Sequence, residues 1–64
     1  MAKFKDLKLG DLFIFVAEPK KHIYEARGNN WYDLAEGGAG GPWHRYDNPE
    51  VKVVAAHRKH LRRG

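Results

Sequence analysis

The segment "DLFIFVA" limits the fold of this chain more than any other stretch. Alternate residues of the segment lie on opposite faces of a strand, and both faces are apolar. Phe13 and Phe15 form one face, and the other carries Leu12, Ile14 and Val16. A short run of aromatic and β-branched residues with two apolar faces is typical of a strand buried on both sides. We therefore expect a β-strand here, with Phe13 and Phe15 in the core.

Turn signals divide the middle of the chain into further short strands. "GNN" predicts a tight hairpin between "HIYEAR" and "WYDLA", because glycine and asparagine tolerate the left-handed backbone that such turns require. "EGGAGGP" predicts a flexible loop, and "DNPE" predicts a turn. The segment "WHRY" lies between these two connections and is expected to be a short strand.

The segment "VKVVAA" could form either a β-strand or the start of a helix. Its three valines favour a strand. The preceding "NPE" offers an N-cap, a proline at the first helical position and an acid in the first turn, so it could also begin a helix. We favour a strand over residues 51–55 and leave a helix through residue 61 as the alternative.

The number and size of these elements predict an all-β protein of one domain. Sixty-four residues without cysteine exclude a disulfide framework and a thiolate zinc site, and no apolar run is long enough to span a membrane. Short strands separated by turns indicate a small five-stranded SH3-like barrel over residues 1–56. A basic tail follows over residues 57–64, with a short helical turn as one option. The chain also lacks a signal-peptide pattern, and we expect a soluble, cytoplasmic protein.

Three segments carry a resemblance to other sequences. "FKDLKLGDLFIF" has a Leu-x-x-Gly-Asp-x-Phe opening, "IYEARGNNWYDL" has a hairpin that begins Tyr-x-x-Arg-Gly, and "HRYDNPEVKVV" has an Asp-x-Pro ending. Together they resemble a class of short uncharacterised proteins from phages and mobile elements. The resemblance covers about residues 4–54 and implies an SH3-like β-barrel. The class has no assigned activity, so the resemblance implies no function.

The positive charge of the chain is confined to its C-terminus. The net charge is +4, but residues 1–54 contain eight Lys/Arg and eight Asp/Glu and therefore sum to zero. The whole excess comes from Arg58, Lys59, Arg62 and Arg63. Four cations within six residues are suited to non-specific contacts with the phosphates of DNA or RNA. A solvated end that improves solubility is the alternative.

Aromatic residues provide a second candidate site. Trp31 and Tyr32 are neighbours on one expected strand, so one of them is expected to be exposed. Together with Trp43 and Tyr46 they form a candidate aromatic binding face, to which Arg45 adds a cation. Such a face could stack bases or hold a peptide. The alternative is that a domain this small uses its aromatics for the core.

The residue content gives little support for catalysis, nucleotide binding or metal binding. The chain contains no serine, threonine, glutamine or cysteine, so we expect no enzyme. The glycine loop lacks the Lys-Ser/Thr end of a phosphate-binding loop, and four scattered histidines do not predict a metal site. We therefore expect no cofactor. Two non-enzymatic functions stay open. One is a nucleic-acid-associated accessory protein that binds phosphates through the basic tail, with Arg45 and an exposed aromatic side chain adding contacts. The other is a protein-interaction module that uses the aromatic face or a strand edge. Neither implies a membrane partner, and the oligomeric state stays open.

Overall fold

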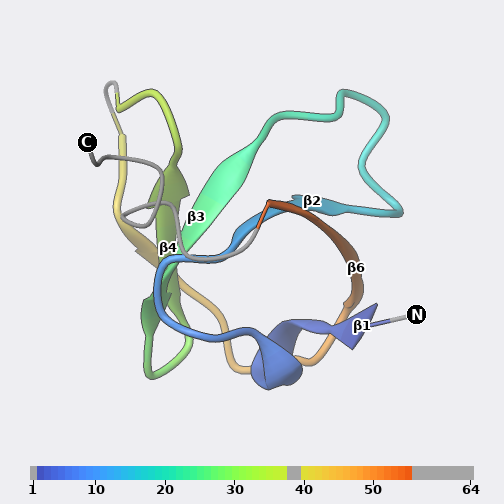
Figure 1. The fold of residues 1–64 in the computed structure, drawn as a ribbon, viewed down its shortest axis with the longest axis horizontal. Coiled ribbons are helices and arrows are strands. Elements are labelled where there is room, and N and C mark those ends of the chain that lie inside the picture. The colour runs from blue at the N-terminus through green and yellow to red at the C-terminus, as the bar shows by residue number, and fades with distance from the viewer. Residues whose placement is uncertain (1, 38–39, 56–64) are drawn as a thin grey trace.

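The protein is a single antiparallel sheet of six strands in the order β1-β6-β2-β3-β4-β5 (Figure 1). The computed structural model describes residues 2–37 and 40–55. Its elements are β1 (Ala2–Lys3), the 3-10 turn η1 (Phe4–Asp6), β2 (Leu12–Phe15), β3 (Tyr24–Gly28), β4 (Trp31–Leu34), β5 (Trp43–His44) and β6 (Glu50–Ala55). No helix in these ranges is long and apolar enough to cross a membrane.

The all-β prediction is confirmed, and each of the five expected strands is present. The sheet curls into a partly open barrel (Figure 1). It has six strands rather than five, because the two-residue β1 pairs with β6. The barrel does not close: β1 and β5 are the two edges of the sheet and are not hydrogen-bonded to each other.

The C-terminal valines form a strand, which confirms the favoured element for residues 51–55. β6 pairs with β2 through Phe15↔Val51 and Ile14↔Lys52, and β1 pairs with the start of β6 on its other side. Cross-strand packing on both sides therefore outweighs the local signals for a helix. The expected basic tail and its optional helical turn lie outside the described residues.

The two faces of β2 differ in burial. Phe13 and Phe15 are buried, with 0% and 3% of their surface exposed, so their predicted place in the core is confirmed. Leu12 and Ile14 on the opposite face are only half-buried, and the expectation of burial on both sides is wrong there. The reason is that the sheet is a single layer, and within residues 2–37 and 40–55 no second layer covers its outer face.

The core consists mainly of aromatic rings. Phe4, Phe13, Phe15 and Tyr24 are buried, and Tyr32 packs against all four of them with ring centroids 5.3–6.2 Å apart. Most of these contacts are edge-to-face or tilted, the arrangement that aromatic quadrupoles favour. Large rings bury much area for each residue, which helps a domain of this size to fold without disulfides.

The "GNN" hairpin is confirmed between β3 and β4. Gly28, Asn29 and Asn30 all have positive φ, at 84°, 52° and 69°. The β3–β4 register shifts between Ala26 and Gly28, so a bulge leads into the turn. This geometry brings Trp31 opposite Gly28 and starts β4, the strand that carries the candidate aromatic residues.

Candidate functional site

The predicted aromatic face is divided between the two faces of the sheet. Trp31 pairs with His44, and Tyr32 pairs with Trp43, across β4 and β5. Paired residues of antiparallel strands share a face, and successive residues alternate. Trp31 therefore lies on the outer face, whereas Tyr32 and Trp43 lie on the inner face and pack against the core.

The outward rings form a continuous exposed cluster, which we call the aromatic row: Trp31, His44 and Tyr46. The ring centroids of Trp31 and His44 are 4.7 Å apart, and those of His44 and Tyr46 are 4.5 Å apart. Trp31 is 43% exposed and Tyr46 is 82% exposed. The row therefore offers a partner two large aromatic surfaces, each in ring contact with the imidazole between them.

Arg45 has its charge compensated within the protein. Its guanidinium lies 4.7 Å from the centre of the Phe15 ring and donates two hydrogen bonds of 2.8 Å to the carboxylate of Asp47. These hydrogen bonds raise the pKa of Arg45 and lower the pKa of the Asp47 carboxyl. A phosphate would have to compete with Asp47 for this guanidinium, so Arg45 is a poor independent anion site.

A shallow groove of about 410 Å³ begins beside the row at Trp31, and we call it the Trp31 groove. Its apolar walls are Leu9, Trp31 and Pro42, and its polar part includes Arg27 and Asp33. A salt bridge of 3.7 Å joins Arg27 Nη2 to Asp33 Oδ2. Apolar walls with a few polar groups are typical of sites that accept a side chain or small ligand.

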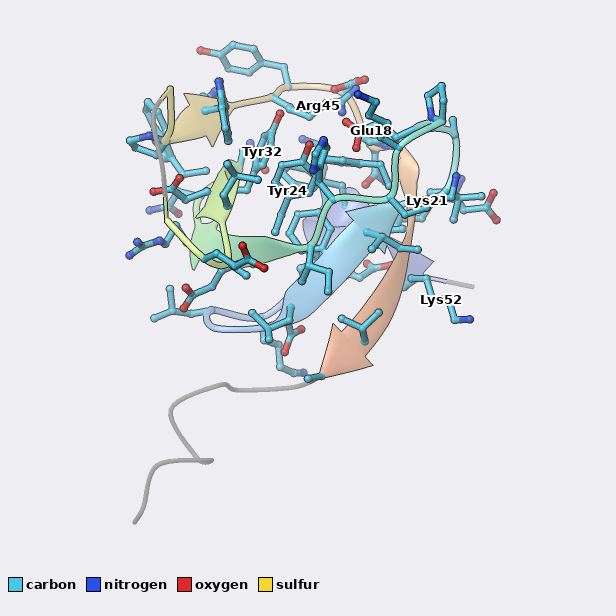
Figure 2. The ribbon with its side chains drawn as sticks, turned by 90° about the horizontal axis from the view of Figure 1, so that it is seen from above. Glu18, Lys21, Tyr24, Tyr32, Arg45 and Lys52 are labelled. Atoms are coloured by element: carbon cyan, nitrogen blue, oxygen red, sulfur yellow. The ribbon has the colours of Figure 1, made fainter. Side chains whose placement is uncertain are left out.

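A second polar cluster lies at one end of the curled sheet. Figure 2 shows Glu18, Tyr24, Tyr32 and Arg45 together there, with Lys52 apart from them. The Tyr24 hydroxyl donates to Glu18, with oxygen–oxygen distances of 3.0 and 3.1 Å. Burial, and then this hydrogen bond, raise the pKa of Tyr24 to about 12. Burial also raises the pKa of Tyr32, against the opposing effect of Arg45. Both phenols therefore stay neutral and are suited to structure rather than to base or nucleophile chemistry.

The residues predicted for phosphate contact are mostly outside the described part of the chain. Arg58, Lys59, Arg62 and Arg63 lie there, as do His57 and His60. Within the described part, Lys21 Nζ donates to the carbonyl oxygens of Val16, at 3.0 Å, and Glu18. No group of three or more metal-ligating side chains occurs among the described residues.

His44 is the member of the aromatic row that the sequence-based prediction missed. A signal for it existed, because alternation along "WHRY" puts His44 and Tyr46 on one face and Trp43 and Arg45 on the other. Nothing local marks Glu18 as the partner of Tyr24, since the contact depends on how the loop after β2 folds over the end of the sheet.

Comparison of the chain with models of protein families, with curated proteins and with solved structures gives no match. The function proposed below therefore rests on the residues and geometry of this chain.

Proposed function

We propose that this chain is a non-enzymatic binding module whose aromatic row contacts a partner protein. The observation that carries the proposal is an exposed aromatic cluster flanked by carboxylates at both ends. Asp33 lines the groove beside Trp31, and Asp47, with 61% of its side chain exposed, follows Tyr46. Tryptophan and tyrosine are enriched among the residues that dominate binding energy at protein interfaces.

The local charges favour a protein partner over a nucleic acid at this surface. Asp33 and Asp47 are each paired with an arginine, so a phosphate would have to compete with a carboxylate for either guanidinium. Residues 1–54 sum to zero charge, so the body has no net electrostatic attraction for a polyanion. An aromatic row with a polar border is also the usual composition of a protein-binding patch.

The proposal is tested by comparing what two variants capture from a nuclease-treated lysate. Trp31→Ala combined with Tyr46→Ala removes both ends of the row. Val54→Ala is the control, because Val54 is 46% exposed but lies on β6 outside the row. We expect the control to retain the partners of the unmodified protein and the double variant to lose them. The proposal would be contradicted if the unmodified protein captured its partners only from a lysate without nuclease treatment. It would also be contradicted if the double variant retained them.

A second candidate is a nucleic-acid-associated accessory function, which the sequence of the basic tail supports. Arg58, Lys59, Arg62 and Arg63 lie within six residues without an acid between them. This function requires only phosphate contacts from the tail and is compatible with a protein-binding row.

We place the protein in the cytoplasm as part of the same proposal. The support is the absence of cysteine, which fits a reducing compartment. The resemblance to short phage and mobile-element proteins supports an origin in such an element.

A further inference from the structure

We propose that two copies of this chain pack together through the outer faces of β6, β2 and β3, with Lys52 of each copy facing Glu25 of the other. This contact goes beyond the proposed function, because it assigns a second copy to strands that do not carry the aromatic row. Three features of this face support it: the sheet register, an apolar centre, and two charges at opposite corners.

The sheet register brings Lys52 and Glu25 to the outer face, on either side of β2. Phe13 is buried in the core, so its neighbours Leu12 and Ile14 lie on the outer face. On one side of β2, Lys52 of β6 pairs with Ile14. On the other side, Glu25 of β3 pairs with Leu12. Paired residues of antiparallel strands share a face, so both charged residues also lie on the outer face.

The centre of this face is apolar. Leu12 and Ile14 are half-buried, and Ile23, just before β3, is 43% exposed. The amide of Ala35 donates to the carbonyl oxygen of Ile23 at 3.0 Å, so antiparallel pairing continues past Tyr24 to Ile23. Because Tyr24 is buried, Ile23 lies on the outer face next to Ile14. In the part of the chain that the structure describes, no second layer covers these side chains, and a second copy would remove them from water.

One cation and one carboxylate lie at opposite corners of the apolar centre. Lys52 is exposed and Glu25 is half-buried, and neither forms an ion pair with another residue that the structure describes. Arg27 and Asp33, on the same face of β3 and β4, are paired with each other. Two strand spacings and two residues along a strand place the Cα atoms of Lys52 and Glu25 ~12 Å apart, with β2 between them.

A two-fold axis satisfies both charges at once. The midpoint between Lys52 and Glu25 lies on β2, between Leu12 and Ile14. An axis that runs between the two copies over this point, at right angles to the line joining the two charged residues, exchanges their positions. Each Lys52 then faces a Glu25 of the other copy, and each apolar centre meets its own counterpart, as in other isologous interfaces. This self-complementarity favours a second copy over an unrelated protein, and oligomerisation is a common support for domains of this size.

Such a dimer keeps the aromatic rows outside the interface. Trp31 and His44 lie on β4 and β5, beyond the strands that pack together. One dimer would therefore present two rows, and a partner with two binding segments would bind it with higher avidity. Salt should weaken the dimer, because it screens exposed charges.

Charge reversal at the two corners tests the arrangement. In a dimer of Lys52→Glu or of Glu25→Lys, like charges face each other at both contacts. We expect sedimentation equilibrium at low salt to show a dimer of the unmodified protein. Either variant should raise the dissociation constant about thirtyfold, from about 1 kcal/mol at each of the two contacts. Lys20→Glu is the control, because it makes the same change of charge at an exposed position in the loop after β2 and should leave dimerisation unchanged.

Mixing the two variants separates this arrangement from general charge effects. In a mixed dimer, opposite charges again meet at both contacts, so an equimolar mixture of Lys52→Glu and Glu25→Lys should associate as tightly as the unmodified protein. From the net charge of +4, a change of two in either direction gives the variants +2 and +6, so general attraction does not account for their pairing. Circular dichroism checks that each variant is folded. Unmodified protein that stays monomeric up to about 1 mM, or a mixture no tighter than its components, would overturn the proposal.

The position of the interface has its own measurement. In a mixture of labelled and unlabelled unmodified protein, isotope-filtered NMR detects contacts between copies. We expect such contacts among the methyl groups of Leu12, Ile14 and Ile23. Contacts found only along the edge strands β1 and β5 would show a different dimer and overturn this one. Neither measurement uses a partner protein, so failure of the dimer and failure of the proposed function are distinguishable.

Discussion

At the scale of single residues, stability depends most on the buried phenylalanines. Phe13 is fully buried and contacts four other rings of the core. We expect Phe13→Ala to lower the free energy of unfolding by about 3–5 kcal/mol, the usual cost of such a cavity. That is as much as a core of this size supplies, so the variant should be largely unfolded in urea-free buffer. Leu9→Ala, at a 59% exposed position, should melt like the unmodified protein. An unchanged midpoint for Phe13→Ala would contradict the core assignment.

A second prediction at this scale concerns stability at high pH. The pKa of Tyr24 is raised to about 12 by burial and by its hydrogen bond to Glu18. In the unfolded chain a tyrosine titrates near 10, so between about pH 10 and 12 the folded protein binds more protons than the unfolded chain. Stability is therefore fully present below pH 10 and falls as pH rises toward 12. Denaturant titrations at several pH values measure this loss, and Tyr24→Phe should reduce it.

Glu18→Gln is the variant that identifies the cause of the shift. It keeps Tyr24 buried but removes the carboxylate that accepts the hydrogen bond and repels the phenolate. We expect the phenolate absorbance of Tyr24 to develop at lower pH in this variant. A titration identical to that of the unmodified protein would mean that Glu18 does not influence Tyr24.

At the scale of elements, the β3–β4 hairpin depends on backbone conformation. Gly28 has a φ of 84°, where a side chain costs about 1–2 kcal/mol. Gly28→Ala should lower the free energy of unfolding by that amount, measured by chemical denaturation. Asn29→Gly is the control: its φ of 52° is also left-handed, and glycine adopts it without penalty. Equal stability of Gly28→Ala and the unmodified protein would contradict this account.

The elements also show what local sequence determines. The alternating "LFIF", the "GNN" turn and the valines of β6 predicted strands that the structure contains. The sequence analysis did not predict β1, because its two residues form a strand only by pairing with β6, Ala2 with Val51 and Lys3 with Glu50. The half-exposed outer face of β2 was missed as well, since a sequence does not state how many layers cover a sheet.

The candidate site could be predicted only in part, because some of its features follow from local sequence and others from long-range contacts. Alternation is a local property, so the opposite directions of Trp31 and Tyr32 follow from their being neighbours. Which of the two faces the core depends on the pairing of Tyr32 with Ala26 and Trp43, and that is a long-range property. The Arg45–Asp47 pair and the Trp31 groove likewise depend on contacts between distant segments.

At the scale of the whole molecule, the body should fold without the tail. The six strands and an aromatic core cluster are formed within residues 2–55, and β6 ends at Ala55. Removing residues 57–64 should leave a cooperative melt and change the free energy of unfolding by about 0.5 kcal/mol or less, because the strands and the core cluster are formed by residues 2–55. Thermal unfolding followed by circular dichroism measures this. Loss of the cooperative transition would show that the tail is part of the core structure.

The charge distribution of the whole molecule predicts how any nucleic-acid binding responds to salt. Only the tail carries net charge, and four cations imply a slope of log K against log salt of about −3.6 on duplex DNA. Affinity should then fall ~150-fold between about 50 and 200 mM salt, without sequence preference. Titration of labelled duplexes of two unrelated sequences at several salt concentrations measures both properties.

Two variants locate the contacts in that experiment. Replacing Arg58, Lys59, Arg62 and Arg63 with alanine should abolish binding, because the remaining chain is neutral. Trp31→Ala should leave the slope unchanged, since phosphate contacts and not stacking set it. Absence of binding at the lowest salt would contradict the nucleic-acid function. Binding that survives the four substitutions would instead place the contacts on the body, where the arginines at positions 27 and 45 are already paired with carboxylates.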